Sequence, residues 1–174
     1  MNKKKILCIA PHPDDETLGC GGTLLKHKKM GDEIYWLICT KMKDTKNTKW
    51  KKNLIEKREV EISKVKKAFG FKKIEILDFP AANLDTIPNI ELVSSISKFI
   101  KLVKPEIIYF NHFNDAHSDH RIIFNAVLSA TKNFRSPFIK SLRMYEVLSE
   151  TNVRKHDSKS IFLLKIGVGK KPHP

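Results

Sequence analysis

Two short clusters of histidine and acidic residues have the residue types of a metal site. The first contains His12, Asp14 and Asp15, and the second is His117-Ser118-Asp119-His120. Within each cluster the outer residues are three positions apart, about one tight turn, so both side chains can converge on one point. Imidazole nitrogen and carboxylate oxygen suit zinc, and three protein ligands with an open fourth position are typical of a catalytic site. We interpret the clusters as two halves of one metal site.

Each cluster comes directly after an apolar run that is typical of a strand. Residues 6–10 precede the first cluster and residues 106–110 precede the second. In an open parallel sheet the crevice lies beyond the carboxyl ends of the strands, so clusters that follow two neighbouring strands reach the same edge. We therefore expect the two clusters to meet in space.

Either cluster alone has a simpler interpretation. Asp14 or Asp15 could cap the helix that is expected to begin near Thr17, because Asp is a preferred N-cap residue. An isolated His-x-Asp-His sequence is often a surface turn, and short motifs carry a high false-positive risk. Two such clusters, each after a strand, favour the metal site.

The glycines after the first cluster permit another interpretation, a dinucleotide-binding turn. Gly19-Cys20-Gly21-Gly22 follows a strand and opens a helix. The spacing disagrees, because that fingerprint has glycine at its first, third and sixth positions directly after the strand. The carboxylates of Asp14, Asp15 and Glu16 would also repel a pyrophosphate at the helix N-terminus. We expect instead that the glycines let the first helix lie close to the sheet.

At these motifs the sequence resembles the LmbE-like or PIG-L family of zinc-dependent N-acetylglucosaminyl de-N-acetylases. The first motif reads Ala10-Pro11-His12-Pro13-Asp14-Asp15-Glu16 and differs from the family pattern by one proline between the alanine and the histidine. The second motif, His117 to His120, matches the family's His-x-Asp-His pattern at every position. The family's first long crossover helix is matched by Arg58, Glu61 and Ala68-Phe69-Gly70. The resemblance covers about residues 4–150.

The resemblance implies that His12, Asp15 and His120 bind the metal. Zn²⁺ is the expected ion, although two histidines and one carboxylate also suit Fe²⁺ or Co²⁺. Such an ion would polarise an amide carbonyl and lower the pKa of water toward neutrality. The implied reaction removes the acetyl group from an N-acetylated amino sugar or its conjugate, of the N-acetylglucosamine type, and releases acetate and a free amine.

The other residues of the clusters are implied to carry the catalytic steps. Asp14 would be the general base for the attacking water. A protonated His117 would stabilise the oxyanion of the tetrahedral intermediate and could also protonate the leaving amine. Asp119 would accept a hydrogen bond from a histidine ring and so fix its tautomer.

The rest of the chain predicts an α/β fold, a Rossmann-like three-layer sandwich with a mostly parallel central sheet. At 174 residues it is long enough for one sizeable core. Strand-like runs alternate with helical patterns, which favours a parallel sheet covered on both faces. The expected strands are residues 5–10, 33–40, 74–78, 106–110 and 142–148, and the clearest helices are 53–69 and 90–103. Gly70 and Pro105 are the expected stop signals.

Two loops are candidate walls of the substrate site. Residues 41–52 are lysine-rich and contain Trp50, and residues 79–88 contain Asn83 and Asp85. Both loops follow strands at the expected active edge, where loops commonly set specificity.

Three polar residues outside the clusters have open interpretations. Arg58 and Glu61 form either a surface ion pair or a substrate contact. Asp115 could bind a sugar hydroxyl, although a turn-forming Asp is favoured.

The formal net charge is +14, with 33 Lys and Arg against 19 Asp and Glu. The lysines are scattered and no nucleic-acid motif accompanies them, which favours a solvated surface over a nucleic-acid partner. The expected partner is a small-molecule amino-sugar conjugate, and the lysines of residues 41–52 leave a phosphorylated or nucleotide-linked sugar open.

The cysteines and the amino terminus favour a cytoplasmic location. Cys8, Cys20 and Cys39 fit buried thiols in a reducing compartment. The apolar run before Pro11 is too short for a signal-peptide core or a transmembrane segment. Peripheral membrane contact stays open, and the sequence does not specify an oligomeric state.

Residues 151–174 are expected to form an atypical C-terminal tail of the deacetylase domain at 1–150. Where family members continue into a terminal helix, this chain has an apolar run at 161–166 followed by Gly167-Val168-Gly169-Lys170-Lys171. The tail is interpreted as a shortened variant, a truncated product or an added edge strand. The alternative function is therefore an impaired, non-catalytic member that binds metal and sugar. Catalysis is favoured because Asp14 and His117 are both kept, which metal binding alone would not need.

Overall fold

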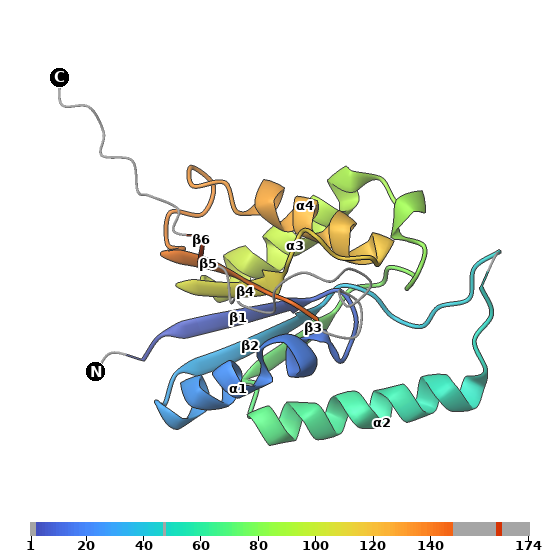
Figure 1. Ribbon diagram of the computed structural model, residues 1–174, viewed down its shortest axis with the longest axis horizontal. Helices are drawn as coiled ribbons and strands as arrows, with labels where there is room; N and C mark the ends of the chain where they lie inside the picture. Colours follow the sequence, from blue (N-terminus) through green and yellow to red (C-terminus); the bar gives the residue numbers. More distant parts are fainter. Residues whose placement is uncertain (1–2, 47, 148–162, 165–174) are drawn as a thin grey trace.

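The computed structural model describes residues 3–46, 48–147 and 163–164. Its strands form one sheet in the order β3-β2-β1-β4-β5-β6 (Figure 1). The strands are β1 Lys5–Ala10, β2 Glu33–Ile38, β3 Lys73–Ile76, β4 Ile107–Asn111, β5 Ser141–Tyr145 and β6 Leu163–Leu164. The first five are parallel to one another, and β6 pairs antiparallel with β5. The predicted mostly parallel sheet is confirmed.

Helices cover both faces of this sheet. They are α1 Asp15–Lys29, α2 Lys52–Phe69, α3 Asn89–Val103 and α4 Ser118–Ala130, with a 3-10 turn, η1, at Leu84–Thr86. In Figure 1, α1 and α2 lie on one side of the sheet and α3 and α4 on the other. Alternate residues of β1 enter different cores: Leu7 and Ile9 pack on the α3 and α4 side, and Ile6 and Cys8 pack on the α1 and α2 side. This is the predicted three-layer sandwich.

The helix ends follow the stop signals closely. Gly70 ends α2 with a φ of 72°, a left-handed conformation that glycine adopts without steric strain. Lys104, just before Pro105, ends α3 in the same left-handed region with a φ of 52°.

The start of α1 differs from the prediction. This helix begins at Asp15, two residues before the predicted start, and the Asp14 side chain makes no capping hydrogen bond. Asp14 therefore occupies the N-cap position of α1, but its side chain does not cap the helix.

One glycine of α1 explains how close this helix lies to the sheet. A Cβ atom built on Gly19 would lie 2.1 Å from Cδ2 of Tyr145 in β5. Tyr145 is fully buried and its hydroxyl donates to the carbonyl oxygen of Ile9, 2.9 Å away, so the ring is held in place. The predicted close approach of helix and sheet is confirmed at this position.

Three predictions concern other parts of the chain. Cys8, Cys20 and Cys39 are buried free thiols, as expected. In the part of the chain that the structure describes, no helix combines the length and apolar character needed to cross a bilayer. The tail predicted at 151–174 lies outside the described residues except for β6, which adds an edge strand beside β5.

Candidate metal centre

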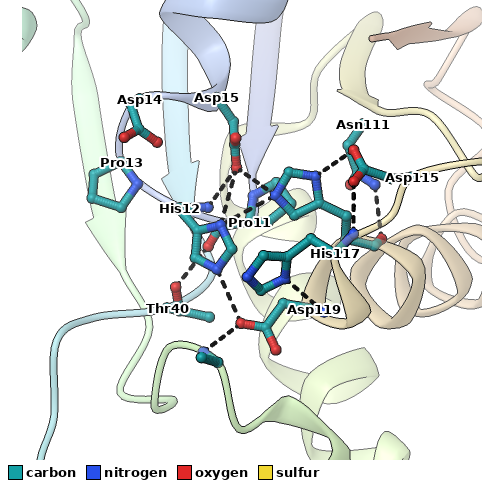
Figure 2. A network of polar contacts seen from close by, with 12 residues as sticks. Pro11, His12, Pro13, Asp14, Asp15, Thr40, Asn111, Asp115, His117 and Asp119 are labelled. Atoms are coloured by element: carbon teal, nitrogen blue, oxygen red, sulfur yellow. Dashed lines mark hydrogen bonds and ion pairs between the residues drawn. The ribbon is translucent and has the colours of Figure 1, made fainter. Parts of the chain in front are cut away.

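The two clusters meet at the carboxyl edge of the sheet. β1 and β4 are parallel neighbours, with Ile6 opposite Ile107, so the segments that follow them leave the sheet side by side. Figure 2 shows the His12 ring, which follows β1, against the residues at the start of α4. Nδ1 of His12 lies 3.1 Å from Nε2 of His120. The pairing of β1 with β4 thus brings together two clusters that lie far apart in the sequence.

Three side-chain atoms form a tight triangle at this point. His12 Nδ1 lies 3.1 Å from His120 Nε2. Asp15 Oδ2 lies 3.6 Å from the first of these nitrogens and 3.2 Å from the second. Tetrahedral zinc with bonds of about 2.0–2.1 Å places its ligands about 3.3 Å apart. The spacing therefore fits one divalent cation.

A carboxylate stands behind each of the two facing histidines. Asp119 Oδ2 lies 3.0 Å from Nε2 of His12, and Asp115 Oδ2 lies 2.7 Å from Nδ1 of His120. When each carboxylate accepts an N–H, the opposite ring nitrogen is left with a lone pair, and these two lone pairs face one another. Only a proton or a cation can satisfy both, and this arrangement is the usual one for metal-binding histidines.

The pKa values of His12, His120 and Asp15 also show that this site favours positive charge on the histidines and negative charge on the aspartate. Burial lowers the pKa of His12, but hydrogen bonds with Asp119 and Asp15 outweigh burial and raise it to about 9. Burial likewise opposes protonation of His120, and hydrogen bonds with Asp115 and Asp15 raise its pKa to about 10. Burial would raise the pKa of Asp15, yet the two histidines hold it far below its usual range. A metal can replace the shared proton.

His117 lies beside this triangle with a defined tautomer. Its Nδ1 accepts a hydrogen bond of 3.1 Å from the backbone N–H of Asp119, so in the neutral ring the proton is on Nε2. One nitrogen from each of His12, His117 and His120 lies within 4.8 Å of the others, so three histidines are a second possible ligand set. We favour the set with Asp15, because its three atoms lie closer together.

Asp14 points away from the triangle and toward a cleft. Its side chain is 47% exposed and lies beside Arg58 of α2, whose Nη1 donates to Asp14 Oδ2 over 3.3 Å. The same nitrogen donates to the carbonyl oxygen of Pro13 over 2.8 Å and pairs with Glu61 at 3.5 Å. The ion pair with Glu61, one of the two interpretations left open by the sequence, is thus present, and Arg58 in addition fixes the loop that carries Asp14.

Asp115 and Asp119 also anchor the backbone around the site. Asp119 is fully buried and accepts from the backbone N–H of Ala82 at 2.7 Å and of Leu84 at 3.2 Å. Asp115 is 5% exposed and accepts from the backbone N–H of His117 at 2.9 Å. The role of Asp115 behind His120 was missed from the sequence, since the path of the loop from β4 to α4 decides where its carboxylate points.

A cleft of about 350 Å³ opens over His12, Asp14 and His117. Both predicted loops form its walls, the first through Lys41, Met42 and Trp50 and the second through Ala81 and Ala82. Asn83 and Asp85 are not among the residues that line this cleft. Asn83 instead joins the two loops, since its Nδ2 donates to Thr48 Oγ1 at 3.1 Å.

Comparisons with known proteins matched a family and individual relatives. The family described as PIG-L, GlcNAc-PI de-N-acetylase, matches residues 7–131. Diacetylchitobiose deacetylase from Thermococcus kodakarensis is 30% identical over 153 residues, which cover 83% of this chain and 57% of that protein. The uncharacterized deacetylase YaiS from Escherichia coli is 30% identical over 140 residues, 75% of this chain and 70% of that protein.

Among solved structures, the conserved protein TT1542 from Thermus thermophilus shares the fold. Its TM-score is 0.70 at 24% identity, and the match covers 91% of this chain and 70% of that chain. The chain described here thus spans 57% of the length of the Thermococcus relative and 70% of each of the other two proteins.

Proposed function

Because this chain belongs to the PIG-L family of de-N-acetylases, we propose that it removes the acetyl group from an N-acetylated amino sugar or its conjugate. The observation that carries the proposal is the triangle of His12 Nδ1, Asp15 Oδ2 and His120 Nε2 at the edge of an open cleft that Asp14 also lines. A site for metal alone would not need that additional carboxylate. The 30% identity to a diacetylchitobiose deacetylase supports an amide of N-acetylglucosamine as the substrate.

His12, Asp15 and His120 would hold the cation. Their two nitrogens and one oxygen suit Zn²⁺, and the same set also accepts Fe²⁺ or Co²⁺. When bound, the ion supplies Lewis acidity at the acetamide carbonyl and lowers the pKa of nearby water toward neutrality. Asp115 and Asp119 keep the two rings in the tautomers that present lone pairs to it.

The chain's own groups then move the protons. Asp14 takes a proton from the water that attacks the carbonyl carbon, and Arg58 keeps its carboxylate in place. His117 donates a hydrogen bond from Nε2 to the oxyanion, and it does so as a neutral ring because its Nδ1 already accepts from the backbone. The positive charge expected on His117 from the sequence is thus not required. The proton on Asp14 is afterwards available to the leaving amine.

Acetate release tests this proposal. We expect zinc-loaded protein to release acetate from N-acetylglucosamine conjugates such as diacetylchitobiose, and to stop after metal removal by a chelator, because the reaction then lacks electrophilic activation of the amide. Restoring the metal should restore release. Absence of acetate from every conjugate, from protein that holds stoichiometric metal, would contradict the proposal and favour the non-catalytic alternative.

A further inference from the structure

A second cavity adjoins the cleft, between α1 and α2. Its volume is about 260 Å³, and Pro13, Asp14, Leu18 and Arg58 line both it and the cleft. Whole small-molecule sites usually measure about 300–1,000 Å³, so this space suits part of a ligand rather than a complete one. The shared residues make it a continuation of the site rather than a separate pocket.

The walls of this cavity are largely apolar. Trp36 of β2 is fully buried and Ile62 of α2 is 8% exposed, and Val65 completes the α2 side. Leu18 of α1 is 55% exposed at the boundary with the cleft. Leu18 thus leaves apolar surface open to water at the entrance, and an apolar ligand group that covered it would gain the free energy of burial.

The charges around the two cavities do not favour an anionic ligand. Among the described residues that line them, the lysine and arginine side chains both have carboxylate partners. Lys41 Nζ lies 2.5 Å from Asp78 Oδ1, and Arg58 is held by Asp14 and Glu61. A phosphate would have to displace one of these pairs, whereas an uncharged chain displaces only water.

We propose that the cavity between α1 and α2 receives an apolar, uncharged aglycone, such as an unbranched alkyl chain, joined to the amino sugar whose acetamide lies at the metal site. The proposal rests on the proposed deacetylase function and narrows its substrate to hydrophobic glycoconjugates. The sugar occupies the cleft over Asp14 and His117, and the alkyl chain passes Leu18 into the cavity that Trp36 and Val65 border.

The length of the alkyl group on the substrate tests this assignment. The specificity constant kcat/KM of zinc-loaded protein would be measured with the methyl, hexyl and octyl glycosides of N-acetylglucosamine, below their micelle concentrations. Each buried methylene adds about fourfold at most, so we expect a gain on the order of tenfold or more from methyl to octyl. Equal values for the three glycosides would overturn the assignment.

Two valine substitutions in α2 form a matched pair. Val65→Phe fills the cavity, so it should reduce the ratio of kcat/KM for the octyl glycoside to kcat/KM for the methyl glycoside to near one. Val60 lies on the same helix, is 53% exposed and lines neither cavity, so Val60→Phe should keep the wild-type ratio. A ratio that Val65→Phe leaves unchanged would also overturn the assignment.

Tryptophan fluorescence separates this inference from the proposed function. The chain has two tryptophans; Trp36 lines the cavity and Trp50 lines the cleft. With metal-free protein, the octyl glycoside should change the emission saturably, and more weakly in Val65→Phe than in Val60→Phe. Failure to deacetylate any glycoside would contradict the proposed function, while the chain-length dependence of this binding signal would still decide for or against the cavity.

Discussion

The lone pairs of the two facing histidines are set by single carboxylates. Asp119 lies 3.0 Å from His12 Nε2 and Asp115 lies 2.7 Å from His120 Nδ1. Such partners fix the tautomer of a ligand and raise its basicity. Affinity for a metal should therefore depend on residues that never touch it.

We predict that Asp115→Asn weakens metal binding about 10- to 100-fold, because the substitution keeps the shape but removes the charge behind His120. Competition with a chromophoric chelator would measure the affinity. Asp85→Asn, which changes an exposed carboxylate of η1, is the control and should bind metal as the wild type does. Equal affinity of Asp115→Asn and the control would contradict the role of Asp115.

At the residue scale the sequence identified the groups that lie in the clusters but not all the groups around them. His12, Asp15 and His120 could be proposed because their spacing within each cluster is local. The contact of Arg58 with Asp14 depends on where α2 lies relative to the loop after β1, and the orientation of Asp115 depends on a loop without regular structure. Neither is encoded in a local pattern.

At the scale of single elements, α1 links the metal site to the sheet. Its first residue is Asp15, and one turn later Gly19 lies against the ring of Tyr145. A side chain at residue 19 would push the helix away from β5 and move Asp15 with it. The position of Asp15, a proposed metal ligand, thus depends on Gly19, which has no side chain.

We predict that Gly19→Ala destabilises the protein by about 1–3 kcal/mol or more, since its Cβ would lie 2.1 Å from Cδ2 of Tyr145. Gly22→Ala is the matched control in the same helix, because nothing lies within 4 Å of the Cβ it would add. The control should be neutral or up to about 1 kcal/mol more stable. Urea unfolding would measure both, and a Gly19→Ala variant as stable as Gly22→Ala would refute this account of α1.

Element positions could be predicted better than element ends. The helix predicted at 90–103 follows from local periodicity and the stop at Gly70 from glycine conformation, and both agree with the structure. The predicted strand at 33–40 was too long, as β2 ends at Ile38 while the chain continues into the cleft wall through Thr40 and Lys41. Apolar composition alone does not distinguish a paired residue from a buried loop residue.

At the scale of the whole molecule, strand order determines which loops share the cleft. β1 is central, between β2 and β4, so the segments after these three strands converge on one edge. The sequence predicted a parallel sheet from alternating elements, but strand order needs tertiary pairing that a single sequence does not display. The assembled site should in turn couple metal binding to the stability of the entire domain.

We predict that micromolar Zn²⁺ raises the melting temperature more at pH 8.5 than at pH 6.5. The raised pKa values of His12 and His120, about 9 and 10, mean that protonation stabilises the metal-free protein fully below the ordinary histidine pKa of about 6.5. This stabilisation is lost as pH rises through the folded values, while competition of protons with metal declines. Thermal unfolding with and without zinc measures the difference, and a larger shift at pH 6.5 would be inconsistent with the site.

The most direct test of the proposed site compares two neighbouring aspartates by substituting each with asparagine. Metal content and acetate release from an N-acetylated conjugate would be measured for Asp14→Asn and Asp15→Asn side by side. Asp14→Asn should retain stoichiometric metal and lose turnover by on the order of 100-fold or more, because it lacks only the base. Asp15→Asn should lose both. Wild-type turnover by Asp14→Asn, or full metal content in Asp15→Asn, would contradict the assignment of base and ligand.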